Sequence, residues 1–137
     1  MQLQDETDAG ALLSEAEALF AAREVEGNLV LGILKGITRG VYVEPTPWLW
    51  SIREGARLRG VVLRTPPHPM AFSPLPTDAC ALLATRLLER GLLPIELNGP
   101  RAGVEGVVSE LKARAPIHAE LVNEMRLFEL RDRKSVV

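Results

Sequence analysis

The sequence predicts a single α/β domain whose elements follow the order α-α-β-β-β-α-β-α-β. Three observations carry this prediction. Apolar residues recur at helical spacing in several segments, two extended runs in the middle are rich in β-branched and aromatic residues, and helices alternate with strands after residue 77. A chain of 137 residues is long enough to bury one core, and its single cysteine excludes an intramolecular disulfide.

Two helices are expected in the first forty residues. The segment Ala11–Ala22 has its apolar residues on one helical face. Asp8 is the expected N-cap, because its carboxylate can accept a hydrogen bond from a first-turn amide. A second helix is expected from about Val25 to Ile37. Its predicted buried stripe consists of Leu29, Val30, Ile33, Leu34 and Ile37.

Three strands follow these helices. Trp48–Arg53 and Leu58–Arg64 are apolar runs, and the polar link Glu54–Arg57 is short enough to close a hairpin between them. The proline-rich segment Thr65–Pro69 stops the pairing, because proline has no N–H to donate to a neighbouring strand. Met70–Ser73 then predicts a third, short strand.

The rest of the chain, from Thr77 onward, alternates helices and strands. A helix is expected over Thr77–Arg90, ended by Gly91 in a left-handed cap. A short strand over Pro94–Leu97 and a helix over Arg101–Arg114 follow. Ile117–Arg131 is predicted to be the last extended segment.

Composition narrows the functional class. The net charge of −2 argues against a nucleic acid or an anionic membrane as a partner. No apolar run approaches the ~20 residues that a membrane helix needs, and the N-terminus is acidic where a signal peptide would be basic. We therefore expect a cytoplasmic protein.

Few side chains suggest catalysis. His68 lies between prolines without a neighbouring acid that would orient it as a general base, and a surface-turn role is favoured for it. His118, at the start of the last strand, is interpreted in the same way. Two histidines do not make a His-rich metal site, so no metal is expected. Nucleophile-elbow glycines are also missing around Ser14, Ser51, Ser73 and Ser109.

Cys80 and the aromatic residues have two interpretations each. Cys80 lies one turn into a predicted helix, where a thiol can become reactive, but its apolar neighbours favour a small buried side chain. Trp48 and Trp50 share one face of a strand, close to Tyr42 in sequence. They are candidates for a ligand pocket, although packing of that face against the two leading helices is the commoner use.

Two strand-to-helix junctions are candidates for phosphate binding, because helix N-termini present unpaired amides. In Ser73–Asp78, two prolines remove donors and Asp78 adds a negative charge, which makes a poor anion site. Asn98–Gly103 has two glycines and Arg101, which is more favourable, but Pro100 again removes a donor. A simple turn and helix start is the favoured interpretation there.

Three phrases of the sequence resemble the GNAT superfamily of N-acetyltransferases. They are Glu24–Gly32, with Asn-Leu-x-Leu-Gly at its end, Gly60–His68, with Arg-Thr-Pro-Pro-His, and Met125–Leu130. The resemblance is closest to the N-terminal half of bacterial GNAT proteins that carry two GNAT-like halves, and it covers about Leu12 to Arg131. It implies a mixed, mostly antiparallel sheet with helices on both faces.

The resemblance also implies an acetyltransferase that moves acetyl from acetyl-CoA to an amine. In the family, a loop of the type Arg/Gln-x-x-Gly-x-Gly/Ala between the fourth strand and the following helix holds the CoA pyrophosphate. The corresponding segment here is Ser73–Asp78, which lacks the glycines and has prolines instead. We therefore expect the intact loop in a C-terminal half, and no activity from this chain alone. The catalytic and cofactor-binding residues stay unassigned.

The end of the chain suggests a truncation. Residues 1–131 are interpreted as the GNAT-like domain and 132–137 as a non-native or disordered tail, because Asp132–Val137 matches the translation of a common sequencing adapter. The expected partner is then the missing C-terminal GNAT domain, with self-association through the face that it would cover. The alternatives are a free-standing pseudo-GNAT binding or interaction module, with its ligand beside Met70–Ser73, and an active acetyltransferase with its cofactor at Asn98–Gly103.

Overall fold

The computed structural model describes residues 1–21, 24–40, 46–66, 68–123 and 127–132, with the backbone alone for 24–28, 120–123 and 127–132. Its helices are α1 (Ala9–Phe20), α2 (Glu24–Thr38), α3 (Thr77–Glu89) and α4 (Arg101–Arg114). Its strands are β1 (Gln2–Asp5), β2 (Trp48–Glu54), β3 (Arg57–Arg64), β4 (Met70–Phe72), β5 (Ile95–Asn98), β6 (Ile117–Asn123) and β7 (Leu127–Asp132). These strands form one sheet in the order β1-β2-β3-β4-β5-β7-β6.

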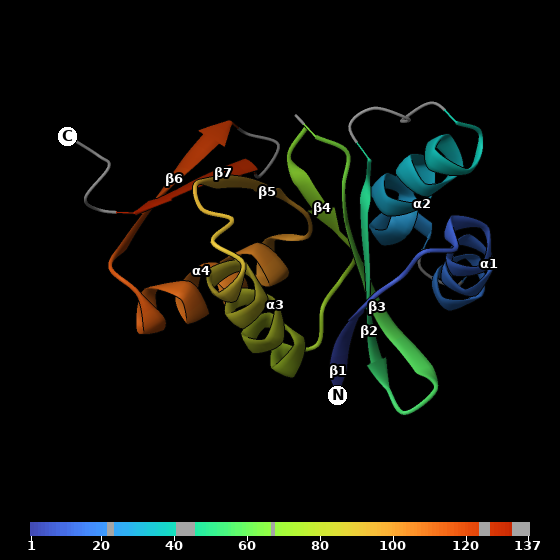
Figure 1. The fold of residues 1–137 in the computed structure, drawn as a ribbon, viewed down its shortest axis with the longest axis horizontal. Coiled ribbons are helices and arrows are strands. Elements are labelled where there is room, and N and C mark those ends of the chain that lie inside the picture. The colour runs from blue at the N-terminus through green and yellow to red at the C-terminus, as the bar shows by residue number, and fades with distance from the viewer. Residues whose placement is uncertain (22–23, 41–45, 67, 124–126, 133–137) are drawn as a thin grey trace.

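The predicted mixed, mostly antiparallel α/β architecture is confirmed. Every neighbouring pair of strands is antiparallel except β4 and β5, which are parallel and connected through α3. Helices α1 and α2 lie on one side of β2 and β3, and α3 and α4 lie on the other (Figure 1). Because side chains alternate along a strand, Leu49 joins the core under α1 and α2 while Trp50 joins the core under α3 and α4.

The predicted order of nine elements was wrong at both ends. β1 was missed because Gln2–Asp5 contains one apolar residue, Leu3, and has no clear alternation. The strand pairs with β2, and the Arg86 guanidinium donates a hydrogen bond of 2.9 Å to the Leu3 carbonyl. Ile117–Arg131 was predicted as one extended segment, but β6 and β7 are two antiparallel strands. No glycine or proline marks the reversal between them in the sequence.

Local signals placed most other elements correctly. The Asp8 carboxylate accepts a hydrogen bond of 3.0 Å from the Ala11 amide, which confirms the predicted N-cap of α1. Gly91 ends α3 with φ +60°, and the Leu92 amide bonds back to the Leu87 carbonyl. Leu29, predicted to be buried, is 41% exposed, whereas Val30 and Leu34 fill the core.

Three predictions concern the membrane, the surface and the end of the chain. Among the described residues, no helix has the length and apolar character needed to cross a membrane. In the same residues, the large hydrophobic side chains that are exposed are Met1 and Leu29. Strand β7 continues to Asp132, and residues 133–137 of the predicted tail lie outside the described residues.

Candidate functional site

A groove lies where the parallel strands β4 and β5 end, and we call it the carboxyl-end groove. Its volume is about 590 Å³. One side is formed by Leu19 and Phe20 at the end of α1, and another by Arg57 and Arg59 of β3. The junctions that lead into α3 and α4 complete it with Pro74, Leu75, Pro76, Pro100, Ala102 and Gly103. Ligands of open α/β sheets commonly bind outside the carboxyl ends of strands, so this groove is the leading candidate site.

The β4–α3 junction is built for close packing. Ser73 is buried, and its hydroxyl accepts a hydrogen bond of 2.9 Å from the Val61 amide of β3. Opposite the junction, Gly60 has no side chain. A Cβ there would lie 3.1 Å from Leu75 Cδ2. Pro76 is the N-cap of α3 and makes no side-chain capping bond. The junction therefore lies tightly on β3, and two of its residues have no amide to offer a ligand.

The glycines of the β5–α4 junction make room for Phe72. A Cβ at Gly99 would lie 2.6 Å from Phe72 Cε2, and one at Gly103 would lie 2.9 Å from the same atom. Phe72, at the end of β4, is 1% exposed. The sequence suggested that these glycines allow the backbone to approach a phosphate. In the structure the aromatic ring occupies that space, and Pro100 is the N-cap of α4.

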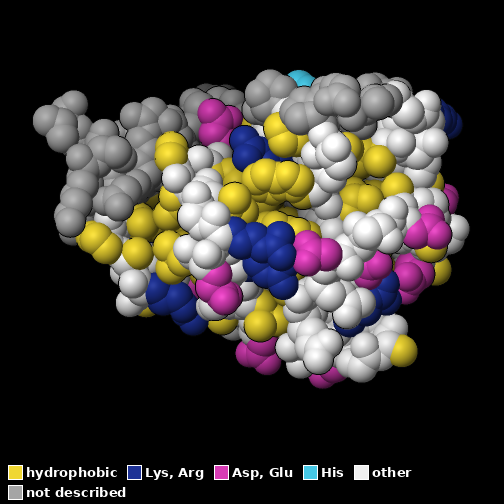
Figure 2. All heavy atoms as spheres, in the orientation of Figure 1, with side chains coloured by type: hydrophobic (Ala, Val, Ile, Leu, Met, Phe, Trp, Pro, Cys, Tyr) yellow, Lys and Arg dark blue, Asp and Glu magenta, His cyan; other side chains and the backbone are white. Residues whose placement is uncertain are grey.

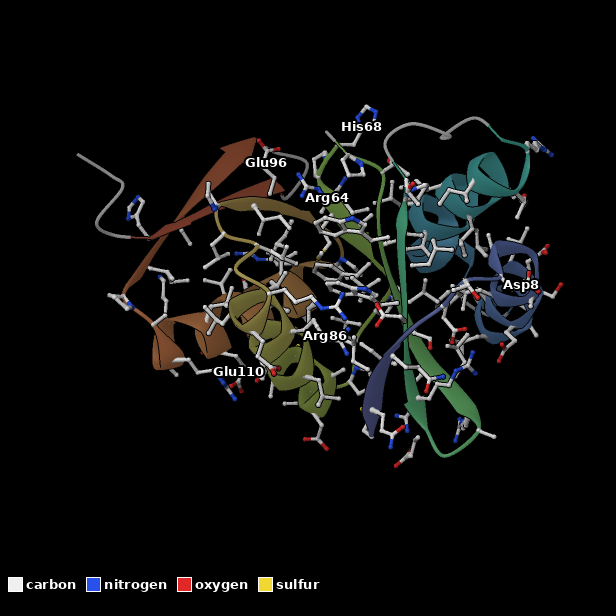
Figure 3. All side chains as sticks on the ribbon, in the orientation of Figure 1. Asp8, Arg64, His68, Arg86, Glu96 and Glu110 are labelled. Carbon is white, nitrogen blue, oxygen red and sulfur yellow. The ribbon has the colours of Figure 1, made fainter. Side chains whose placement is uncertain are left out.

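A second hollow, of about 410 Å³, lies beside two stacked tryptophans on the sheet face under α3. The Trp48 and Trp50 ring centroids are 6.1 Å apart with an interplanar angle of 15°. Arg64 lies 5.1 Å from the Trp48 ring, and Arg86 and Arg90 lie 5.4 and 5.5 Å from the Trp50 ring. The space-filling view shows arginine side chains set among hydrophobic ones on this face, and Figure 3 labels Arg64 and Arg86 (Figures 2 and 3).

These tryptophans do not pack against the leading helices. That expectation was wrong, because an alternating strand pattern defines two faces but does not say which helices cover each one. Trp50 packs with the α3–α4 core instead. The faces of both rings are already in contact with arginines, which matches a stabilising cation–π arrangement. Tyr42 lies outside the described residues.

The arginines at Trp50 also hold β1. Arg90 donates hydrogen bonds to both Asp5 carboxylate oxygens, at 3.4 and 3.0 Å. These bonds lower the pKa of Asp5 below its ordinary value, against a smaller opposing effect of burial. Arg86 Nη1 is buried and lies 3.6 Å from the same carboxylate, without a hydrogen-bond partner in the described structure.

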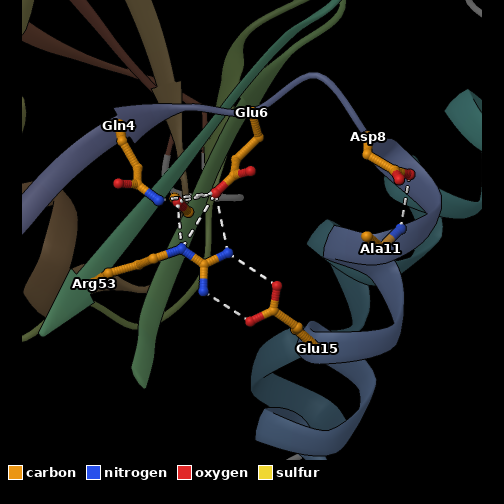
Figure 4. Close-up of polar contacts among 7 residues, drawn as sticks. Gln4, Glu6, Asp8, Ala11, Glu15 and Arg53 are labelled. Atoms are coloured by element: carbon orange, nitrogen blue, oxygen red, sulfur yellow. Dashed lines mark hydrogen bonds and ion pairs between the residues drawn. The ribbon is translucent and has the colours of Figure 1, made fainter. Parts of the chain in front are cut away.

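A separate polar cluster joins β2 to α1 and to Glu6, which follows β1. Arg53 donates to both oxygens of Glu15, at 2.7 and 2.9 Å, and to Glu6 Oε1 at 3.0 Å (Figure 4). The buried Ser51 hydroxyl donates to the same Glu6 oxygen at 2.5 Å. Burial opposes ionisation of Glu6, but the bonds from Ser51 and Arg53 outweigh it and lower its pKa. The hydroxyl has no histidine beside it in this cluster, so the arrangement is one of structural ion pairs.

The other candidate side chains are scattered over the described structure. His68 is exposed in the turn before β4, where its amide bonds to the Thr65 carbonyl at 2.9 Å. His118 is half-buried in β6, and Ser14 and Ser109 are exposed on helices. No group of three or more histidine, cysteine or acidic side chains in this part of the chain is placed to hold a metal ion.

Cys80 is predicted to be inert in the native protein. It is 4% exposed, and burial, assisted by Glu110, raises its pKa, which disfavours the reactive thiolate. A Cβ at Gly106 of α4 would lie 2.7 Å from its sulfur, which shows how closely α4 packs against it. We expect a thiol-specific chromogenic reagent to label Cys80 only after unfolding in guanidinium chloride. Rapid stoichiometric labelling under native conditions would contradict this expectation.

Searches of protein-family models, curated proteins and solved structures found no match to this chain.

Proposed function

We propose that this chain is a GNAT-type domain with a degenerate cofactor position, and that it serves as the non-catalytic N-terminal half of an acetyltransferase acting on an amine. The family resemblance of the sequence is the starting point. The number of strands before α3 agrees with this resemblance once β1, which the sequence did not predict, is counted. With β1 included, Met70–Phe72 is the fourth strand and is followed directly by a helix, which is where the family places its cofactor loop.

The observation that carries the non-catalytic role is the composition of the β4–α3 junction. A CoA pyrophosphate would need backbone amides at this place, and Pro74 and Pro76 have none. Asp78 lies in the first turn of α3, where its negative charge would repel a phosphate. At the second junction, Phe72 fills the space beside Gly99 and Gly103. Neither junction therefore favours a diphosphate, which also weakens the reading of an active enzyme with its cofactor at Asn98–Gly103.

Calorimetric titration with acetyl-CoA tests this proposal. We expect no saturable heat at micromolar concentrations of this chain, because the amides that would hold the diphosphate are missing. Tight binding by the chain alone, competed by CoA, would overturn the non-catalytic assignment. The coding DNA supplies the second test, since the half-enzyme requires a downstream segment with an Arg/Gln-x-x-Gly-x-Gly/Ala loop.

The second candidate function is a free-standing module that binds a ligand. The carboxyl-end groove favours this alternative, because a concave site of about 590 Å³ is retained although its walls do not suit a diphosphate. A genuine stop codon after Val137 in the coding DNA would favour the module over the half-enzyme.

A further inference from the structure

The carboxyl-end groove combines nonpolar walls with positive charge. The residues that line it from α1 and from the two helix junctions are all nonpolar, including three prolines. The two charged residues that line it are Arg57 and Arg59, both from the start of β3. A groove of this kind matches a ligand with an apolar body and a negatively charged end.

Both arginines have hydrogen-bonding capacity for a ligand. Arg57 is exposed, and no described carboxylate lies within ion-pair distance of it. Arg59 Nη1 donates to Glu54 Oε1 at 2.5 Å, but the Glu54 side chain is 56% exposed, so this pair is open to competition. A guanidinium has five N–H groups and binds a carboxylate through two of them at once.

The same groove disfavours a polyphosphate. The three prolines Pro74, Pro76 and Pro100 reduce the number of amides that could surround a phosphate chain. The positive charge comes from side chains of one strand, which suits a single compact anion. We propose that the groove binds a linear medium-chain carboxylate, with the chain against Leu19, Phe20 and the prolines and the carboxylate at Arg57 and Arg59. The proposal gives a ligand class to the binding-module alternative above.

Calorimetric titration of the full chain with octanoate tests the proposal, with 1-octanol and octylammonium as matched ligands of the same chain length. We expect saturable binding of octanoate, at least about tenfold tighter than that of octanol, and no binding of octylammonium, because only the carboxylate can pair with the arginines. Equal affinity for octanoate and octanol would overturn the proposal, and so would the absence of saturable octanoate binding.

Variants locate the site. Replacing Ala102, an exposed groove residue in the first turn of α4, with tryptophan should block the groove and abolish binding without disturbing the core. The double variant Arg57→Gln/Arg59→Gln should weaken octanoate binding about tenfold or more. Glu54→Gln should strengthen binding, because it releases Arg59. Arg114→Gln, at the far end of α4, is the control and should change nothing.

Binding that survives Ala102→Trp would place octanoate elsewhere and overturn the proposal. An unfolding transition measured for each variant shows that the fold is retained. The acetyl-CoA titration is read separately. Binding of octanoate without binding of acetyl-CoA supports both the non-catalytic role and the carboxylate ligand. Binding of acetyl-CoA alone overturns both. If neither compound binds, only the carboxylate ligand is overturned.

Discussion

Replacing Phe72 with alanine is expected to lower the free energy of unfolding by about 3–5 kcal/mol, as for other fully buried aromatic residues. Phe72 is 1% exposed, and its ring fills the space between the ends of β4 and β5 against Gly99 and Gly103. A loss of this size is a large fraction of the ~5–15 kcal/mol that stabilises an ordinary domain. Urea unfolding followed by tryptophan fluorescence measures it.

A double-mutant cycle tests whether Phe72 is the reason for the glycines. Gly99→Ala alone should cost about 1–3 kcal/mol, because its Cβ would overlap the ring. In Phe72→Ala the ring is gone, so the added methyl group should cost much less. Leu29→Ala is the control, since Leu29 is 41% exposed and should change stability by less than about 1 kcal/mol. Strictly additive costs for Phe72 and Gly99 would show that the glycines have another role.

The same glycines show where reasoning from the sequence stops. A glycine after a strand predicts a close approach of the backbone to some other group, but it does not identify the group. Here the group is the aromatic side chain of Phe72 in β4, which is 27 residues away from Gly99 in the sequence. The prolines of the first junction were more informative, because the loss of an amide is a local property and needs no tertiary contact.

The elements of the fold also differ in whether local signals or long-range contacts determine them. Helices α1, α3 and α4 and the β2–β3 hairpin were predicted because periodicity, caps and turn residues are local signals. β1 was missed because its stability comes from pairing with β2 and from contacts with Arg86 and Arg90. These two arginines lie more than 80 residues after their partners in β1. The face of β2 that holds Trp48 and Trp50 was predicted, whereas the helices that cover it depend on how the chain crosses the sheet.

Arg53→Met is expected to destabilise the protein by about 2–3 kcal/mol at neutral pH. Arg53 joins Glu6, Glu15 and Ser51, and the side chains of Arg53 and Glu6 are only 13% and 20% exposed (Figure 4). Removing the guanidinium leaves the carboxylate of Glu6 partly buried with less compensation, although its residual exposure keeps the cost below that of a fully buried pair. Arg59→Met is the matched control, because its partner Glu54 is exposed and such pairs contribute at most about 1 kcal/mol.

The acid dependence of stability gives this prediction a second readout. The hydrogen bonds from Arg53 lower the pKa of Glu15, and those from Ser51 and Arg53 together outweigh burial and lower the pKa of Glu6, both relative to the ordinary value of 4.5. A lowered pKa in the folded state stabilises the protein above the unfolded value, and this stabilisation is lost as protons bind at lower pH. Wild type should therefore lose stability as pH falls below about 5. In Arg53→Met the two carboxyls titrate closer to their unfolded values, so less of this stabilisation exists to be lost. The difference in unfolding free energy between wild type and variant should therefore become smaller as the pH falls from neutral to ~3. A constant difference over that range would show that Arg53 contributes through packing of its aliphatic stem and not through its charge.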